Sequence, residues 1–163
     1  ENNFYLKPKI LLIYKNLNIR CPFQNSWDEI ERWKDNFPSV KITLTNQESL
    51  VKSLRKSRIS ISTYNATVFL ETLSYNFPTI IFWDEEFSNI NEESKIYFDL
   101  LESVGIFHKS PLKAAQKVIE IWDDVPTWWE STLVQEAREK FCDYFSRSSI
   151  NPLSSFVELI NKP

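Results

Sequence analysis

The sequence has few of the residues that common functional sites require. Its 163 residues include one glycine, two cysteines, one histidine and no methionine. A single glycine cannot build the glycine-rich phosphate loop of a dinucleotide dehydrogenase or a P-loop ATPase. Cys21 and Cys142 are isolated from each other and from other ligand types, so neither a zinc site nor a disulfide framework is predicted. We expect no metal site and no resident cofactor.

Charge and hydropathy exclude further classes of protein. The 19 basic and 22 acidic residues leave a net charge of −3, which offers no field for nucleic acid. No apolar run approaches the roughly 18 residues that a membrane-spanning helix needs, and the N-terminus lacks the order of a signal peptide. We therefore expect a cytoplasmic protein. Because the chain starts at Glu1, we also expect it to be one domain, residues 1–163, of a longer protein.

Short apolar runs alternate along the chain with segments that carry helix signals. The runs Ile10–Tyr14, Val40–Leu44, Ile59–Ser62 and Thr79–Trp83 predict buried strands, and Ile106–Phe107 predicts a short fifth strand. Helices are expected near residues 27–36, 47–57, 66–75, 92–104, 111–124, 128–146 and 152–161. This alternation predicts an α/β fold: a Rossmann-like parallel sheet of about four to five strands, with helices on both faces and C-terminal helices packed across it.

Helix ends have their own signals. The pairs Thr45 with Glu48 and Thr127 with Glu130 fit the reciprocal capping box, and Ser110 precedes a proline suited to the first helical position. Gly105 and Asn76 stand where two helices would need a left-handed residue to end.

The segment from Ser62 to Glu71 is the best candidate for a ligand site, because it ends a buried strand and opens a helix. Ligands of open parallel sheets bind at the carboxyl ends of strands, where helix N–H groups point outward. Polar side chains in this segment could add hydrogen bonds to phosphate oxygens: Ser62, Thr63, Asn65 and Thr67. Glu71, one turn after Thr67, could accept hydrogen bonds from two vicinal hydroxyls. The alternative is that Ser62 or Asn65 only caps the helix and Glu71 is a solvated charge.

Other candidates have weaker support. Lys15 and Arg20 follow the first predicted strand and could neutralise phosphate, although solvated loop charges are more frequent. His108 could act as a general base, but a packed or exposed histidine is the more common case. The pair Trp128 and Trp129 favours core and corner packing, with an exposed docking patch as the alternative.

The stretch from Ser62 to Asp84 resembles the donor-binding segment of the C-terminal domain of GT-B-fold glycosyltransferases. More narrowly, it is similar to bacterial transferases linked to surface-carbohydrate synthesis. That narrower likeness extends to Glu31–Pro38, Tyr97–Leu101, Gly105–Pro111, Trp122–Val125 and Trp128–Trp129.

The resemblance implies roles for particular residues. The diphosphate of a nucleotide-sugar would bind at the helix N-terminus formed by Asn65, Ala66 and Thr67. Glu71 would accept hydrogen bonds from the ribose hydroxyls. The base would lie near Thr45 and Asn46. The nucleotide-sugar would be a substrate rather than a cofactor. In one departure from the family pattern, Asn76 stands in for the glycine before Pro78.

The resemblance also implies partners. These are a nucleotide-sugar donor, a carbohydrate acceptor for which a lipid-linked form is one alternative, and an N-terminal domain of the same protein. The catalytic base would come from that N-terminal domain, so this chain would be the donor half and inactive alone. A cytoplasmic protein at the periphery of the inner membrane would fit this activity. A sugar-nucleotide epimerase, a polyol-phosphate transferase or a non-catalytic binding module remain alternatives.

Overall fold

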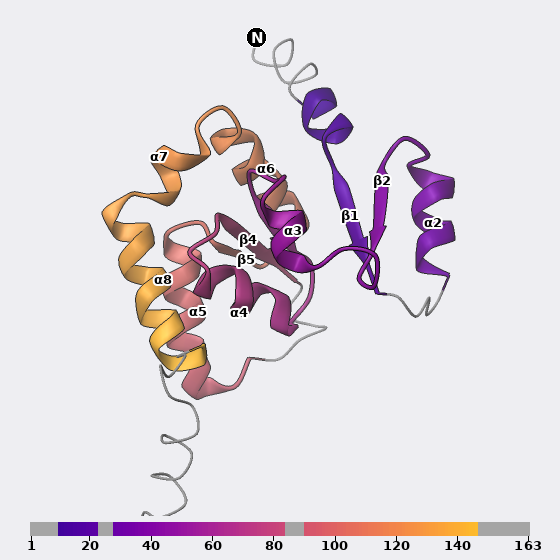
Figure 1. Ribbon diagram of the computed structural model, residues 1–163. Coiled ribbons are helices and arrows are strands. Elements are labelled where there is room, and N and C mark those ends of the chain that lie inside the picture. Colours follow the sequence, from indigo (N-terminus) through magenta and orange to yellow (C-terminus); the bar gives the residue numbers. More distant parts are fainter. Residues whose placement is uncertain (1–9, 23–27, 84–89, 147–163) are drawn as a thin grey trace, which may run out of the picture.

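A computed structural model of the protein describes residues 10–22, 28–83 and 90–146 (Figure 1). The fold is α/β, with strands divided between two small parallel sheets. β1 (Asn18–Cys21) pairs with β2 (Lys41–Leu44). The other sheet has the order β3-β4-β5, built from Ser60–Ser62, Thr79–Phe82 and Phe107–His108. Because no ladder joins β1 to β3 in the described residues, the predicted single Rossmann-like sheet of four to five strands is wrong.

The first predicted strand is also wrong, since residues 10–15 are helical. Ile13 packs against a core cluster, whereas Ile10, Leu11 and Leu12 are 48–51% exposed. A short apolar run does not distinguish a strand from a helix, because both can place such residues against a core. The strand that does form, β1, alternates polar and apolar residues and was not predicted.

The helices cover both faces of the three-stranded sheet, as expected. On one face, α6 (Pro111–Ile121) contributes Ala114, Val118 and Ile121 to a core cluster with Ile80 of β4. The other face is covered by α4 (Thr67–Ser74), α5 (Glu92–Ser103) and α8 (Thr132–Phe145). Figure 1 shows α8 running alongside α5. α8 also contacts α4, so a C-terminal helix does pack across this layer.

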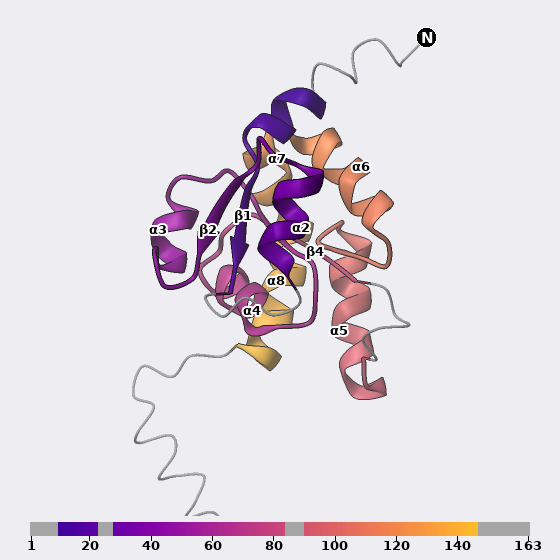
Figure 2. The same ribbon diagram turned by 90° about the vertical axis from the view of Figure 1, so that its right-hand side faces the viewer.

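The other labelled helices are short. α2 (Glu29–Asn36) lies beside the sheet of β1 and β2 in both views (Figures 1 and 2). α3 (Leu50–Leu54) connects the two sheets, and α7 (Val125–Trp129) precedes α8. The helix predicted over residues 128–146 is therefore divided into α7 and α8. The helix predicted over residues 152–161 lies outside the described residues.

Helix N-termini agree with the sequence signals only in part. Ser110 caps α6 as predicted, since its hydroxyl accepts a hydrogen bond from the Lys113 amide at 3.2 Å. The two capping boxes are wrong: α3 begins after Ser49, and α7 begins after Asp124.

The C-terminus of α4 is built as predicted. Asn76 adopts the left-handed region at φ 52°. The amide of Phe77 donates to the Thr72 carbonyl at 2.9 Å and the amide of Asn76 to the Leu73 carbonyl at 3.0 Å, the pattern of a Schellman motif. The Trp129 indole N–H donates to the Asn76 carbonyl at 3.1 Å and to its side-chain oxygen at 3.0 Å. This left-handed turn is thereby tied to α7.

The C-terminus of α5 follows the same rule. Gly105 has φ +76°, and the Ile106 amide donates to the Leu101 carbonyl at 2.9 Å. The prediction of left-handed helix ends at Asn76 and Gly105 is therefore confirmed.

Candidate functional site

The turn from β3 into α4 leads to a helix N-terminus that no side chain of the described residues caps. Ala66 is the N-cap residue, with extended backbone at φ −140° and ψ 171°, and among the described residues no side-chain hydrogen bond caps this end of the helix. The interpretation in which Ser62 or Asn65 caps α4 is therefore wrong. The first N–H groups of a helix have no partner within the helix, so those of α4 are left to solvent or a ligand.

The predicted polar side chains surround this helix end. Thr63, Asn65 and Thr67 are exposed, whereas Ser62 is only 8% exposed at the end of β3. Glu71 is exposed one turn after Thr67, on the polar stripe that the spacing predicted. The first turn of α4 holds no acidic residue. An anion would consequently meet no carboxylate at the helix end itself.

Thr45 and Asn46 follow β2 in an exposed turn. The Thr45 amide donates to the Cys21 carbonyl at 3.0 Å, and Cys21 is aligned with Leu44 in the parallel pair. The two residues therefore lie at the carboxyl end of the two-stranded sheet, where the resemblance requires a base-binding loop.

Arg20 lies within β1 and not after a strand. Its guanidinium donates to the Glu48 carbonyl at 2.7 Å and to the Ser53 hydroxyl at 3.2 Å. These contacts tie β1 to the start of α3. A role for Arg20 in phosphate binding stays a prediction, now alongside this structural role.

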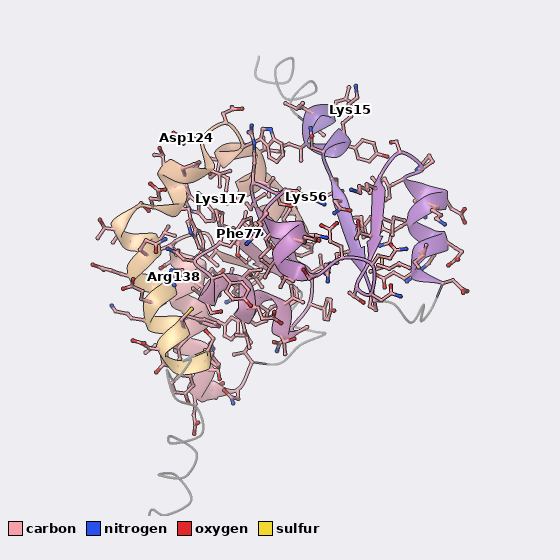
Figure 3. The ribbon with its side chains drawn as sticks, viewed as in Figure 1. Lys15, Lys56, Phe77, Lys117, Asp124 and Arg138 are labelled. Atoms are coloured by element: carbon pink, nitrogen blue, oxygen red, sulfur yellow. The ribbon has the colours of Figure 1, made fainter. Side chains whose placement is uncertain are left out.

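Lys15 lies at the opposite end of the sheet from the one expected. It is the last residue of the helix over residues 10–15, and Figure 3 shows it before the start of β1, away from the carboxyl end of that strand. The argument that placed Lys15 at the carboxyl edge depended on a strand at Ile10–Tyr14, which is a helix. Phosphate binding by Lys15 thus keeps no support from the fold.

His108 is half-buried at the end of β5. Its Nε2 lies 3.0 Å from the Gly105 carbonyl, and burial lowers the pKa of the imidazole below its ordinary value. These contacts fit a packed histidine that holds the turn after α5.

Carboxylates and tryptophans complete the list of predicted features. Among residues 10–22, 28–83 and 90–146, no group of three His, Cys, Asp or Glu side chains could hold a metal ion. Three adjacent acids that follow the Thr79–Trp83 run in the sequence, Asp84–Glu86, lie outside the described residues. Trp129 is 3% exposed, and the Trp128 indole donates to the Val104 carbonyl at 3.1 Å. The two tryptophans form packing contacts, as favoured, and not an exposed docking patch.

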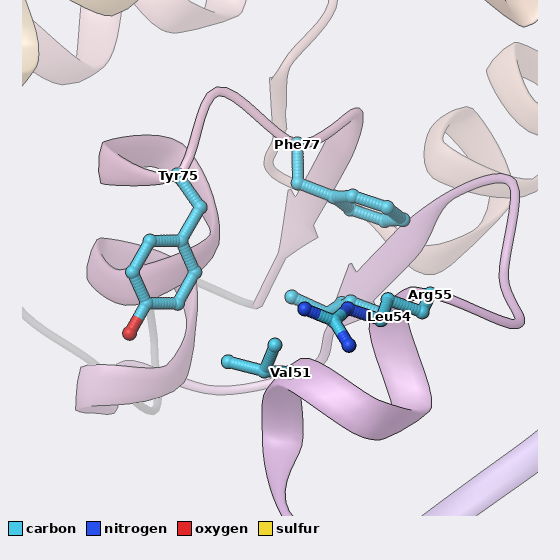
Figure 4. Close-up of a pocket in the computed structure, with 5 residues that line it drawn as sticks. All are labelled: Val51, Leu54, Arg55, Tyr75 and Phe77. Carbon is cyan, nitrogen blue, oxygen red and sulfur yellow. The ribbon is translucent and has the colours of Figure 1, made fainter.

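One concave feature was missed from the sequence. A pocket of about 350 Å³ lies between α3 and the C-terminus of α4 (Figure 4). Its lining residues are Val51, Leu54, Arg55, Tyr75 and Phe77. The only signal in the sequence was Val51 four positions before Arg55, with two aromatic residues flanking Asn76.

The site and fold define an α/β domain with an uncapped helix N-terminus at the carboxyl end of a parallel strand. The family model of the LIC12162 family transferase matches residues 12–160, so the chain belongs to this transferase family. The comparisons with curated proteins and with solved structures find no match. Within the described residues, no helix is both long and apolar enough to cross a membrane.

Proposed function

We propose that this chain is the nucleotide-sugar binding domain of a GT-B-type glycosyltransferase that acts in bacterial surface polysaccharide synthesis. It would form the C-terminal half of a two-domain enzyme, with the general base supplied by the N-terminal half. Membership of the LIC12162 transferase family supports group transfer as the reaction class. The nature of the transferred group comes from the resemblance of residues 62–84 to donor-binding segments.

The observation that carries the proposal is the uncapped N-terminus of α4. Its free N–H groups and the positive end of its dipole suit an anionic ligand. Thr63, Asn65 and Thr67 stand exposed around it and can add hydrogen bonds to phosphate oxygens. The diphosphate of a nucleotide-sugar is the ligand class that matches both features.

Glu71 extends the site along α4. A carboxylate one turn from the helix start can accept hydrogen bonds from two ribose hydroxyls without opposing the phosphates at the helix end. The loop at Thr45 and Asn46 would then receive the base. Glu71 would orient the donor and take no part in bond breaking.

The chemistry assigned to this domain is electrostatic. When the glycosidic bond to the donor breaks, negative charge develops on the leaving nucleoside diphosphate. The N–H groups of α4 and the side chains of Asn65 and Thr67 would stabilise that charge, as fixed donors do in other sites where an oxyanion forms. The chain alone is expected to bind nucleotide weakly and to be inactive. The cytoplasm, where nucleotide-sugars are made, is its expected location, at the inner membrane where a lipid-linked acceptor would be found.

The alternatives differ in their support. A polyol-phosphate transferase would use the same helix end and is also a transferase. A sugar-nucleotide epimerase catalyses an isomerisation, which membership of a transferase family does not favour. A scaffold that acts through Trp128 and Trp129 would need these side chains free to contact a partner, but both are engaged in packing contacts.

Calorimetric titration with UDP-, GDP-, CMP- and dTDP-linked sugars tests the proposal. We expect one nucleotide class to bind the wild-type chain and Glu71→Gln to weaken it about tenfold, the loss typical of a charged hydrogen-bond partner. Glu136→Gln is the matched control, because Glu136 is an exposed glutamate on α8 and away from the site. Equal losses of nucleotide affinity in the two variants, or no binding of any nucleotide at millimolar concentration, would refute the proposal.

A further inference from the structure

The pocket between α3 and the C-terminus of α4 is open to solvent and is lined mainly by apolar side chains. Its volume of about 350 Å³ is within the range of ligand pockets. Val51 and Tyr75, two of its lining residues, are 44% and 55% exposed. The pocket therefore presents apolar surface to solvent that a ligand could cover.

One wall of this pocket is held in place by several hydrogen bonds. Tyr75 and Phe77 flank Asn76 in the Schellman motif, and the Trp129 indole fixes Asn76 on its far side. The Arg138 guanidinium donates to the Leu73 carbonyl at 3.2 Å and satisfies the same helix end. These bonds fix the backbone that carries Tyr75 and Phe77, which lowers the entropy that a ligand loses on binding.

The opposite wall carries a cation without a partner. No hydrogen bond, ion pair or ring contact engages the Arg55 guanidinium in the described part of the chain. Lys56, the next residue in the chain, differs, since its ammonium pairs with Glu48 at 3.0 Å. Figure 4 shows the Arg55 side chain extending into the pocket, toward Tyr75. A guanidinium at an apolar surface favours a carboxylate that it can bind through two parallel hydrogen bonds.

We propose that this pocket binds a small aromatic carboxylate, whose ring lies between Val51 and Phe77 and whose carboxylate pairs with Arg55. The aliphatic and aromatic lining matches a planar apolar body. The unpaired guanidinium supplies the one charge that the pocket offers, so the ligand carries a single anionic group. A neutral aromatic compound of the same size would leave that guanidinium unpaired and bind less tightly.

This second site is separate from the proposed donor site. It lies at the C-terminal end of α4, whereas the donor site lies at its N-terminus. With a rise of about 1.5 Å per residue, the helix puts the two ends about 12 Å apart. The proposal therefore stands or falls independently of the donor-binding function.

The test is a titration of the ¹⁵N-labelled chain with 2-naphthoate, followed by amide chemical shifts. We expect shifts concentrated at residues 51–55 and 75–77 and a Kd of about 1 mM or tighter, typical of a ligand of this size. The neutral analogue 2-naphthalenemethanol is expected to bind about tenfold more weakly. Absence of shifts at 10 mM, shifts elsewhere only, or equal binding of the neutral analogue would overturn the proposal.

Two variants separate the charge from the pocket itself. Arg55→Gln removes the guanidinium and should weaken 2-naphthoate about tenfold, while Lys52→Gln, which removes an exposed charge from the same helix, should leave the Kd unchanged within about twofold. Val51→Glu places a carboxylate four residues before Arg55, where it can pair with the guanidinium and block the pocket. Because Val51 is exposed, this variant should stay folded, as its amide spectrum will show, and lose binding. An unchanged Kd in Arg55→Gln, or binding that survives Val51→Glu, would contradict the assignment.

Discussion

Replacing Asn76 by alanine tests how the C-terminus of α4 is held. Alanine loses two stabilising features: the tolerance of asparagine for φ 52°, and the side-chain oxygen that accepts the Trp129 indole N–H at 3.0 Å. A left-handed conformation costs an ordinary L-residue about 1–2 kcal/mol, and a hydrogen bond contributes about 0.5–1.5 kcal/mol. The indole retains the Asn76 carbonyl as an acceptor. The free energy of unfolding should therefore fall by about 2 kcal/mol, or about 4–8 °C in Tm for a domain of this size.

The contrast with glycine isolates the backbone contribution. Asn76→Gly also loses the side-chain hydrogen bond, but glycine adopts positive φ without the steric cost. Urea unfolding monitored by circular dichroism should show Asn76→Ala less stable than Asn76→Gly by about 1 kcal/mol. At Lys140, an exposed position inside α8, the order should reverse, because alanine is favoured over glycine in a helix by about 1 kcal/mol. If alanine were at least as stable as glycine at position 76, the left-handed turn would not be the cause.

Three further changes have definite expected outcomes. Gly105→Ala should lower the free energy of unfolding by about 1–2 kcal/mol in a urea titration, because φ is +76° and the new Cβ would lie 2.9 Å from Lys117 Cε. An unchanged or increased free energy of unfolding would contradict this. Ser110→Ala should lower the free energy of unfolding by about 1 kcal/mol and Ser110→Asp by much less, since only alanine removes the side-chain acceptor at the N-cap. Equal Tm values for the two variants would refute the capping role of Ser110. Burial lowers the pKa of His108 in the folded state, so the unfolded state binds its proton first as the pH falls below 6.5. The free energy of unfolding should then decrease between about pH 7.5 and about pH 5.5, with a shallower slope in His108→Gln, and identical slopes would oppose the assignment.

The two helix ends at Asn76 and Gly105 were predictable because their signal is local. A left-handed residue is required wherever a helix ends in a Schellman motif, and only glycine and asparagine adopt it readily. The same holds for Ser110, whose hydroxyl and following proline act within one turn.

The first strand could not be predicted, because its position depends on contacts distant in sequence. β1 is set by pairing with β2, by the Arg20 contacts to α3, and by a hydrogen bond of 2.9 Å from the Thr43 hydroxyl to the Asn18 side chain. Its polar residues serve these contacts, so it lacks the apolar run expected of a buried strand.

The capping boxes failed for a related reason. Glu48, expected to bond back to Thr45, instead accepts hydrogen bonds from Lys56 and Ser53, and the Lys56 contact chiefly lowers the pKa of its carboxyl. The Glu48 carboxylate therefore bonds to side chains five and eight residues later in the chain and not to Thr45, as the capping box requires. For the candidate site, the polar stripe of α4 followed from helical periodicity, whereas whether a side chain caps the helix depends on the conformation of the turn before it.

The measurement closest to the central claim is the affinity of the chain for its nucleoside diphosphate after Thr67→Asp. A carboxylate at the first position of α4 stabilises the helix by about 0.3–1 kcal/mol but repels a diphosphate bound there. The account predicts that the Kd rises about tenfold while Tm stays the same or increases, which separates lost binding from lost folding. Thr132→Asp is the matched control, because Thr132 is the first residue of α8, is exposed, and also follows an N-cap without a side-chain bond. An unchanged Kd in Thr67→Asp, or an equal rise in Thr132→Asp, would contradict diphosphate binding at the N-terminus of α4.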